Sequence, residues 1–444
     1  MKPKRVVILI ADDWSPIAGC YGNPVVQTPN IDALAAEGTV FRRAYCASPS
    51  CGPSRATLFT GLHSYAHGQY GHPHGINYFR IRTDVATLPS LLRGAGVFTG
   101  AIGKRHVEPV SACGFDYVLP DKLSQSAEDC EAEVDEFLRQ AGGRDYFLYV
   151  GSTLPHRTVR GFDSPVFDSL GRTTYDPASV PVPSFLGDLP GVRADLADYY
   201  TAVSRFDAWV GRMLGKFRAA GQYEGTLFLI MSDHGMPFVG AKASPFEGGH
   251  RCPLIVAAPG SLPAGAKTDA LACWTDVAPT ILEWFGQPAP DPCHGSSLLG
   301  VLERNEPPAR EVYLSQMFHG VTEYYPYRVL VRDRFKYIHR LEPELVMPLP
   351  CDLVDSDSFD AIYASPDSGF GNRGARATFL PGGESLFDLV DDPGETVNLA
   401  DDPAFAEILQ EMLSSLQAHR EATADPLLRK DVQSTLLRSL RERD

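Results

Sequence analysis

The sequence of 444 residues has neither a long apolar stretch nor a surplus of basic residues. No hydrophobic run approaches the roughly 18 residues that a membrane-spanning helix needs, so no membrane partner is expected. Lys and Arg number 40 against 55 Asp and Glu, which gives a net charge of −15. Because phosphate binding needs a basic face, this balance argues against a nucleic-acid partner. An anionic small substrate remains compatible with this net charge if cationic side chains at the binding site outweigh the negative potential of the whole protein.

Paired cysteine motifs are also missing. The nine cysteines are irregularly spaced and include no CxxC pair. This pattern disfavours a disulfide framework or a zinc ribbon and indicates a reducing compartment. The N-terminal apolar run, residues 6–11, is too short for the core of a signal peptide, and two Asp residues follow it at once. We therefore expect a soluble, cytoplasmic protein.

The composition is that of a globular protein, with 44% hydrophobic and 21% charged residues, which excludes a disordered chain. Segments of strand and helix character alternate over the first 300 residues. Strands are expected at residues 6–11, 99–102, 146–150, 226–232 and 254–258. Helices are expected at residues 31–37, 87–95, 127–141, 195–220 and 276–285. This alternation predicts an α/β fold, with a large mixed, mostly parallel sheet between layers of helices.

The pattern of expected secondary structure changes at about residue 305. Short strands are expected at residues 312–315, 327–331, 336–339 and 385–390, followed by a helix at 405–424. The stretch 348–383 is rich in Gly, Pro, Ser and Asp, and we interpret it as a long loop or cap. The sequence thus predicts a catalytic α/β domain over residues 1–304. It predicts a smaller α+β subdomain over 305–444, with a four-stranded antiparallel sheet and a terminal helix.

Side chains suited to metal binding or acid–base chemistry follow four of the predicted strands. They are Asp12 and Asp13, Lys104 and His106, His156, and Asp233 and His234. In parallel sheets the chemistry gathers at the carboxyl ends of the strands, so we expect these groups to meet. Adjacent carboxylates after an apolar strand are costly unless a cation neutralises them. Three carboxylates and an imidazole suit one divalent cation.

The sharpest local signal is the segment CGPSRATLFTG at residues 51–61. Cys51 opens a predicted helix, and Arg55 follows one turn later. A Cys at this point meets the positive end of the helix dipole, which favours a reactive thiol or an anion site. A buried structural Cys at a turn is the alternative for an isolated cysteine.

This segment resembles the sulfatase signature C-x-P-S-R-x-x-x-L-T-G and departs from it only at Phe59. The stretch GVFTGAIGKRH at residues 96–106 is similar to a second sulfatase motif, G-Y-x-T…G-K-x-H. The resemblance implies an alkaline-phosphatase-like fold. It also implies that a formylglycine-generating enzyme, a transient partner, oxidises Cys51 to Cα-formylglycine. The hydrated aldehyde would then be the nucleophile that attacks sulfur.

The resemblance implies roles for the remaining candidates. The cation ligands would be Asp12, Asp13, Cys51 in its modified form, Asp233 and His234. Calcium is the family's metal, but the imidazole of His234 stands where most members have Asn and leaves Mn²⁺ or Mg²⁺ open. The residues that bind the sulfuryl oxygens would be Arg55, Lys104 and Lys242. His106 would act as general base and His156 as general acid.

Within the family, several stretches resemble the heparan N-sulfatases, which are also called sulfamidases. They include LPHR at 154–157, SDHGMPF at 232–238 and SQMFHGVT at 315–322. The resemblance implies hydrolysis of a sulfate ester or sulfamate of a sugar or oligosaccharide, with N-sulfoglucosamine as the first candidate. Gln316, His319 and Glu323 are expected to reach the cleft and select the sugar. A further group, His63, His67, His72 and His74, is interpreted as wall of the cleft.

Two other functions remain open at this point. Gly52 and His234 favour a phosphonate monoester or phosphodiester hydrolase on the same scaffold. A catalytically silent binder of sugar sulfates is the second alternative, although the complete set of candidate groups argues against it. The oligomeric state also stays open, and a homo-oligomer is compatible with the sequence.

Overall fold

The structure is a computed structural model that describes residues 3–119, 125–158, 161–304 and 310–429. Its centre is an eight-stranded sheet with the strand order β4-β3-β5-β1-β6-β7-β2-β8. The strands are β1 Arg5–Ala11, β2 Thr39–Tyr45, β3 Phe98–Gly103, β4 Tyr117–Val118, β5 Tyr146–Gly151, β6 Thr226–Ser232, β7 Arg251–Ala257 and β8 Ala266–Cys273. Only β7 runs against the others among these eight strands. The predicted mixed, mostly parallel sheet is confirmed.

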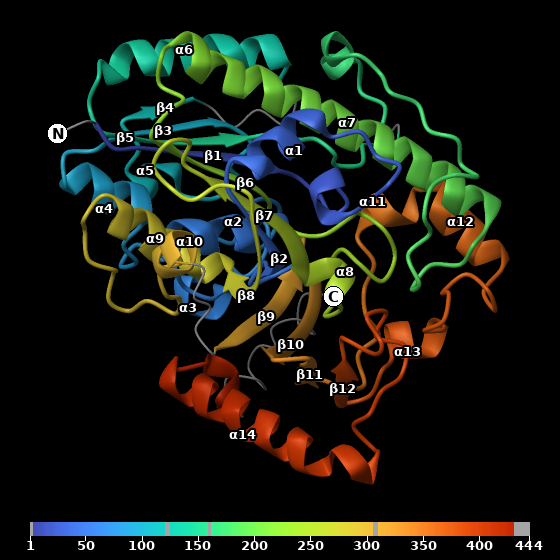
Figure 1. Ribbon diagram of the computed structural model, residues 1–444. Helices are drawn as coiled ribbons and strands as arrows, with labels where there is room; N and C mark the ends of the chain where they lie inside the picture. Colours follow the sequence, from blue (N-terminus) through green and yellow to red (C-terminus); the bar gives the residue numbers. More distant parts are fainter. Residues whose placement is uncertain (1–2, 120–124, 159–160, 305–309, 430–444) are drawn as a thin grey trace.

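Helices cover both faces of the sheet (Figure 1). One layer holds α1 Pro29–Ala36, α6 Ala127–Ala141 and α7 Pro190–Ala219. The other holds α2 Cys51–Thr60, α4 Leu88–Gly94, α9 Val277–Trp284 and α10 Leu299–Arg304. Alternate residues of β1 point into the two layers: Val7 and Leu9 pack in the first, Val6 and Ile8 in the second. The strand is therefore apolar throughout, as a strand buried on both faces must be.

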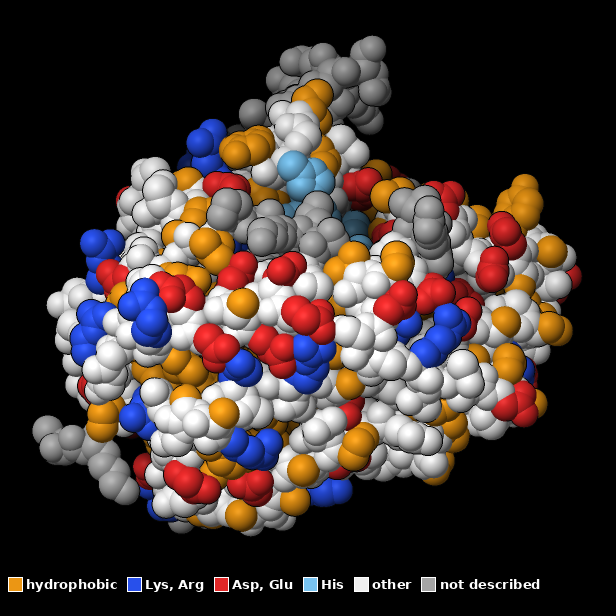
Figure 2. All heavy atoms as spheres, turned by 90° about the horizontal axis from the view of Figure 1, so that it is seen from above, with side chains coloured by type: hydrophobic (Ala, Val, Ile, Leu, Met, Phe, Trp, Pro, Cys, Tyr) orange, Lys and Arg blue, Asp and Glu red, His pale blue; other side chains and the backbone are white. Residues whose placement is uncertain are grey.

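Short helical turns connect these elements. They are η1 Gly19–Tyr21, α3 Ser64–His67, α5 Val110–Cys113, η2 Pro165–Leu170, α8 Glu247–His250 and η3 Trp274–Asp276. Among the described residues, no helix combines the length and the hydrophobicity that a bilayer crossing requires. Figure 2 views the molecule from the side of α6 and α7, where acidic and basic side chains are intermingled. Arg212 joins these two helices through ion pairs with Glu128 and Glu131.

A second sheet follows in the C-terminal region, as expected. It has the order β12-β11-β10-β9, and all its pairings are antiparallel. Its strands are β9 Glu311–His319, β10 Glu323–Arg332, β11 Phe335–Arg340 and β12 Glu384–Asp388. One face packs against α14 Ala406–Ala422, and the other packs against residues of the large sheet (Figure 1). The two short turns around α14 are η4 Pro403–Phe405 and η5 Pro426–Leu428. The predicted domain boundary between residues 304 and 305 lies next to residues 305–309, which the structure does not describe, and it stays a prediction.

The stretch 348–383, which we interpreted as a long loop or cap, is not a continuous loop. It contains three short helices, α11 Cys351–Val354, α12 Asp357–Ala364 and α13 Ala375–Phe379. The side chain of Ser356 caps α12 by accepting a hydrogen bond from the backbone of Phe359, and α12 packs on α7. Each helix buries only one or two side chains. No apolar period builds up over so few turns, so composition alone suggested a loop.

Three strands of the large sheet, β2, β4 and β8, have no counterpart in the sequence prediction, and β4 is only two residues long. Arg42 and Arg43 interrupt the apolar character of β2, and a register irregularity falls at the same point. The strand β8 lies at the sheet edge, and three consecutive polar residues, Lys267–Asp269, occupy its first half. An edge position requires less hydrophobicity than a central one, which hides such strands from pattern analysis.

Candidate active site

The site begins at the first residue of α2. Ser50 is extended and precedes the helix, Cys51 is its first residue, and Gly61 ends it with a positive φ of 69°. Pro53 sits in the first turn, where its missing N–H costs nothing. All ten helical residues are buried. The sequence thus fixes the Cys51 side chain at the amino end of a rigid, enclosed helix.

The carboxyl ends of β1 and β6 bring the predicted metal ligands together. The strands are parallel, with Ala11 opposite Ser232. The residues that follow are therefore neighbours, and the backbone N–H of Asp13 donates to Oδ1 of Asp233 at 3.0 Å. Ligand atoms of Asp12, Cys51 and Asp233 lie within 4.8 Å of one another, and so do those of Asp13, Cys51 and His234. Side chains from three distant segments of the chain therefore lie close together, as expected.

Buried cations face these carboxylates. The Arg55 guanidinium contacts Oδ1 of Asp12 at 3.0 Å and Oδ2 of Asp233 at 2.9 Å. Lys104 pairs with Asp12, and the Lys242 ammonium lies 2.9 Å from Oδ2 of Asp13. Arg55 is fully enclosed and is not among the described residues that line the pocket, whereas both lysines are. The lysines can therefore contact a ligand directly, and Arg55 acts here on the carboxylates.

The chemistry of this donor set fits a cation. Oδ1 of Asp13 is buried without a hydrogen-bond partner among the described residues and lies 3.1 Å from Nε2 of His234. The same Nε2 is 3.3 Å from the sulfur of Cys51. Burial raises the pKa of Asp13, but Lys242, His156 and His234 outweigh it and bring the value to about 2. A buried, ionised carboxylate oxygen that accepts no hydrogen bond and lies beside an imidazole suits a divalent metal.

A glycine lets Lys104 approach the centre. Gly151 ends β5 beside β3, and a Cβ added there would lie 2.0 Å from the carbonyl oxygen of Lys104. Any larger residue would push the chain that carries Lys104 and His106 away. His106 itself has a positive φ of 55°. Such backbone strain costs on the order of 1–3 kcal/mol and persists where the surroundings hold it.

Two histidines beside Cys51 have opposite charge preferences. Burial and the neighbouring His72 lower the pKa of His106 to about 3, although its hydrogen bond with Cys51 opposes this shift. Burial also lowers the pKa of His156, but Asp13 outweighs it, and the net shift is upward. His106 is therefore neutral and His156 favours the imidazolium. Burial raises the pKa of the Cys51 thiol, but Lys104, His234 and Lys242 hold it well below its usual range.

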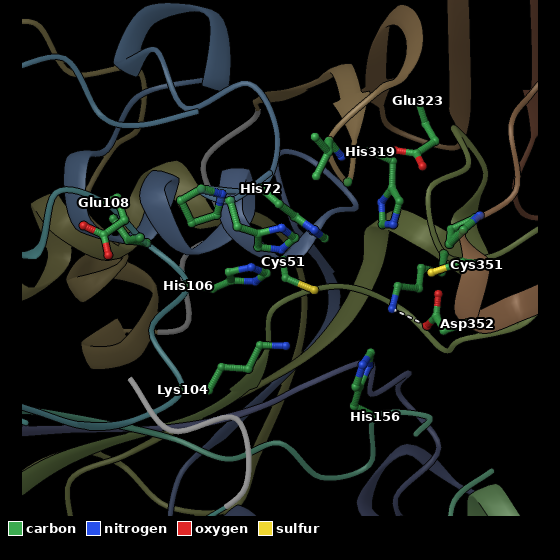
Figure 3. Close-up of a pocket in the computed structure, with 17 residues that line it drawn as sticks. Cys51, His72, Lys104, His106, Glu108, His156, His319, Glu323, Cys351 and Asp352 are labelled. Carbon is green, nitrogen blue, oxygen red and sulfur yellow. Dashed lines mark hydrogen bonds and ion pairs between the residues drawn. The ribbon is translucent and has the colours of Figure 1, made fainter. Parts of the chain in front are cut away.

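These groups open into a pocket with a volume of about 520 Å³ (Figure 3). Segments far apart in the chain supply its wall. They are α2, the loop 72–74, the segment 104–108, His156, Lys242, the strand end and turn 319–323, and the start of α11. The pocket is large enough for a sugar-sized ligand.

A family model described as Sulfatase matches residues 4–287, and a second, described as N-sulphoglucosamine sulphohydrolase, C-terminal, matches residues 241–367. The chain belongs to the sulfatase family. It is 34% identical to human N-sulphoglucosamine sulphohydrolase over 96% of its own length and 91% of the relative's. An ulvan-active sulfatase from Formosa agariphila is 25% identical over 95% of this chain and 81% of the relative.

Solved structures show the same fold for this sulfatase. The phosphonate monoester hydrolase of Agrobacterium radiobacter has a TM-score of 0.70 and 19% identity, with 94% of this chain and 96% of that chain covered. A protein in complex with its substrate D-glucosamine-2-N,6-O-disulfate has a TM-score of 0.69 and 19% identity, with 96% and 99% covered. Sulfatases generally use a metal and formylglycine, and residues able to hold a metal surround Cys51 in this one.

The sulfatase pocket brings together some of the proposed sugar-binding residues and not others. His319 and Glu323 line it. Gln316 is fully buried, and its Nε2 donates to the carbonyl of Ala243 at 3.3 Å. The described lining does not include Gln316. The neighbouring Gly320 and Val321 do belong to the wall.

The four further histidines divide into two pairs. His72 and His74 line the pocket and pack against His106, with ring centroids 4.5 and 5.4 Å away. His63 and His67 are buried and are not part of the described lining. The interpretation as cleft wall thus fits only the first pair. The sequence spacing of the four histidines does not show this division. It arises from the turn in the chain that separates the two pairs.

Three pocket residues with ionisable side chains were not predicted from the sequence, namely Glu108, Cys351 and Asp352. Glu108 follows the Lys104–His106 segment and could have been included by its position. Cys351 and Asp352 begin α11, inside the stretch taken for a loop. No local pattern marks them as site residues.

Proposed function

We propose that this sulfatase hydrolyses the sulfamate or sulfate ester of a sugar, with an N-sulfoglucosamine-type saccharide as substrate. Support comes from the 34% identity to human N-sulphoglucosamine sulphohydrolase, which extends over nearly the whole length of both chains. A pocket of about 520 Å³ suits a saccharide of one or two rings. The unpaired state of all nine cysteines supports a cytoplasmic location.

The proposed metal ligands are Asp12, Asp13, Asp233 and His234, together with residue 51. The bound cation, Ca²⁺ first and Mn²⁺ or Mg²⁺ as alternatives, would polarise the sulfuryl group and lower the pKa of the nucleophile. Oxidation of Cys51 to Cα-formylglycine would supply a hydrated aldehyde as that nucleophile. Intact-mass analysis of the Cys51 peptide tests the modification, because formylglycine is about 18 Da lighter than Cys.

The surrounding side chains of the chain have separate tasks in this proposal. Lys104 and Lys242 bind the sulfuryl oxygens and neutralise the charge that grows on them in the transition state. Arg55 holds Asp12 and Asp233 in place. His156 donates a proton to the departing atom, and His106 accepts the proton of residue 51.

One observation carries this proposal: His106 and His156, whose pKa values are shifted in opposite directions, line the same cavity as Cys51. Pairs of titratable groups whose pKa values are pushed apart divide the acid and base roles between them. His106 bonds to Cys51, as a base for the nucleophile must. His156 bonds to Asp13 at 2.5 Å and reaches the pocket, as an acid for the leaving group must.

A phosphonate monoester or phosphodiester hydrolase is the second candidate, favoured by His234 and Gly52. One purified batch assayed against an aryl sulfate, an aryl phosphonate and N-sulfoglucosamine decides between them. The sulfatase proposal expects the highest kcat/KM on a sulfated substrate. A higher kcat/KM on the phosphonate would favour the alternative.

A further inference from the structure

Asp352 is a pocket carboxylate for which the proposed mechanism has no role. It lies on α11, and its Oδ2 accepts a hydrogen bond from Nζ of Lys242 at 2.7 Å. The same ammonium lies 2.9 Å from Oδ2 of Asp13. Lys242 therefore bridges the aspartate at the end of β1 and Asp352, which comes 110 residues after Lys242 in the chain.

One oxygen of Asp352 is open to a ligand. Its Oδ1 makes no hydrogen bond to any described residue, and the side chain is 18% exposed. One carboxylate oxygen each of Asp13 and Asp352 and a ring nitrogen of His156 lie within 4.8 Å of one another. Figure 3 shows His156 and Asp352 on one side of Cys51, with His106 and Lys104 on the other. An atom that leaves beside His156 therefore meets Asp352.

The other two carboxylates of the wall differ from Asp352. Glu108 and Glu323 each accept hydrogen bonds from backbone N–H groups close to them in sequence. In the described part of the chain, neither makes a hydrogen bond or an ion pair with Lys242 or His156. Among the described wall carboxylates, Asp352 is the one placed beside the proposed acid.

N-linked and O-linked sulfates differ in the charge of the leaving group. Hydrolysis of R–NH–SO₃⁻ breaks the S–N bond, the water oxygen joins sulfur, and both water protons go to nitrogen, which gives R–NH₃⁺ and SO₄²⁻. Hydrolysis of R–O–SO₃⁻ gives neutral R–OH, SO₄²⁻ and a proton that passes to solvent. Only the N-linked substrate creates a cation at the broken bond. A carboxylate next to that atom favours it through a charge-assisted hydrogen bond.

We propose that Asp352 is the specificity-determining residue that selects N-sulfated amino sugars, by accepting a hydrogen bond from the nitrogen released at His156. This inference rests on the proposed sulfamidase function and deepens it. Asp352 thus has two contacts. Its Oδ2 accepts a hydrogen bond from Lys242, and its Oδ1 accepts one from the amino group of the sugar. An alcohol leaving group gains much less from the same carboxylate.

The variant D352N removes the charge and nearly keeps the shape. We expect its kcat/KM on N-sulfoglucosamine to fall about 30-fold more than its kcat/KM on 4-nitrophenyl sulfate, the size of a hydrogen bond to a charged group. D352E should recover part of the difference. The matched control E108Q removes a carboxylate from another part of the pocket and should change both substrates by the same factor. Equal losses for D352N would make Asp352 only a support for Lys242 and overturn the proposal.

A binding measurement tests the amino site independently of turnover. Titration calorimetry on the wild-type enzyme should show glucosamine binding roughly tenfold more tightly than glucose, and D352N should lose this preference. A wild-type enzyme that prefers glucosamine but does not cleave N-sulfoglucosamine would refute the proposed substrate and keep the amino site. Equal wild-type affinities for the two sugars would overturn the inference even if N-sulfoglucosamine is cleaved.

Discussion

Nδ1 of His156 lies 2.5 Å from Oδ2 of Asp13, so a carboxylate of the proposed metal centre also holds the proposed general acid. The imidazole is oriented by this contact and remains partly exposed to the pocket, with 28% of its side chain accessible. Metal binding and proton donation therefore share one residue.

The variant H156A should lose kcat by about 10²–10⁴-fold on N-sulfoglucosamine, because the departing nitrogen needs a proton. The loss on 4-nitrophenyl sulfate should be much smaller, since nitrophenolate leaves without protonation. Steady-state kinetics on both substrates measure the difference. H106A is the contrasting variant and should lower both rates, because the base acts on the nucleophile. Equal losses for H156A on both substrates would contradict the role of acid.

Removal of divalent cations should abolish activity and lower the thermal unfolding midpoint. The three buried carboxylates Asp12, Asp13 and Asp233 would then face one another with only protein cations between them. A ligand present at 100 times its Kd stabilises the folded state by about 2.7 kcal/mol. Differential scanning fluorimetry after chelation, with Ca²⁺, Mn²⁺ or Mg²⁺ added back, measures the effect and ranks the metals.

The matched variant for the metal prediction is D13N, which removes the charge of the Asp13 carboxylate. Its unfolding midpoint should no longer respond to added cation. A midpoint that rises with Ca²⁺ by the same amount in D13N and in the wild type would show that the cation binds elsewhere.

The protein should lose stability in mild acid through a cluster of buried and half-buried histidines on α14 and its neighbours. Nε2 of His419 lies 3.3 Å from Nε2 of His63, and the His294 ring packs on His63. Burial lowers the pKa of His294 to about 4; burial and His294 together lower that of His419 to about 4. The unfolded chain, with pKa near 6.5, binds these protons first. Stability is therefore full above pH 6.5 and falls as the pH drops toward 4, by a few kcal/mol in total.

Urea unfolding at pH 7.5 and pH 5 measures this dependence. H419F keeps a ring that can stack on Tyr313, whose centroid lies 3.6 Å from that of His419, and it removes one titrating group. Its stability should change less between the two pH values than that of the wild type. S414A, on the exposed side of the same helix, should behave as the wild type does. An unchanged pH dependence in H419F would argue against the cluster.

The variant D195A should weaken both stability and the placement of His156. Arg157, the next residue in the chain, makes two hydrogen bonds to Asp195 at 2.7 and 2.8 Å, and both side chains are buried. Breaking a buried ion pair leaves the remaining charge uncompensated and costs about 3–5 kcal/mol. We expect a lower unfolding midpoint and a lower kcat on N-sulfoglucosamine. An exposed pair, Arg139 with Glu136 on α6, offers the control E136A, which should change neither.

Much of the site follows from local sequence. The apolar run of β1 followed by Asp12 and Asp13 specifies a buried strand with carboxylates at its end, and the segment from Cys51 to Gly61 specifies a capped helix. Both appear as expected, with these carboxylates buried beside Cys51. Such patterns are local because hydrophobic period and caps act between residues a few positions apart.

The sequence by itself determined the α/β architecture, the segment around Cys51 and the side chains that end the central strands. Only the tertiary structure decided that Gln316 is enclosed while His319 faces the pocket, and that Asp352 meets Lys242 across 110 residues. The physical reason is that a local pattern sets the type of an element and its buried face. Which distant elements pack together depends on the whole core, and the contacts of α11 arise only there.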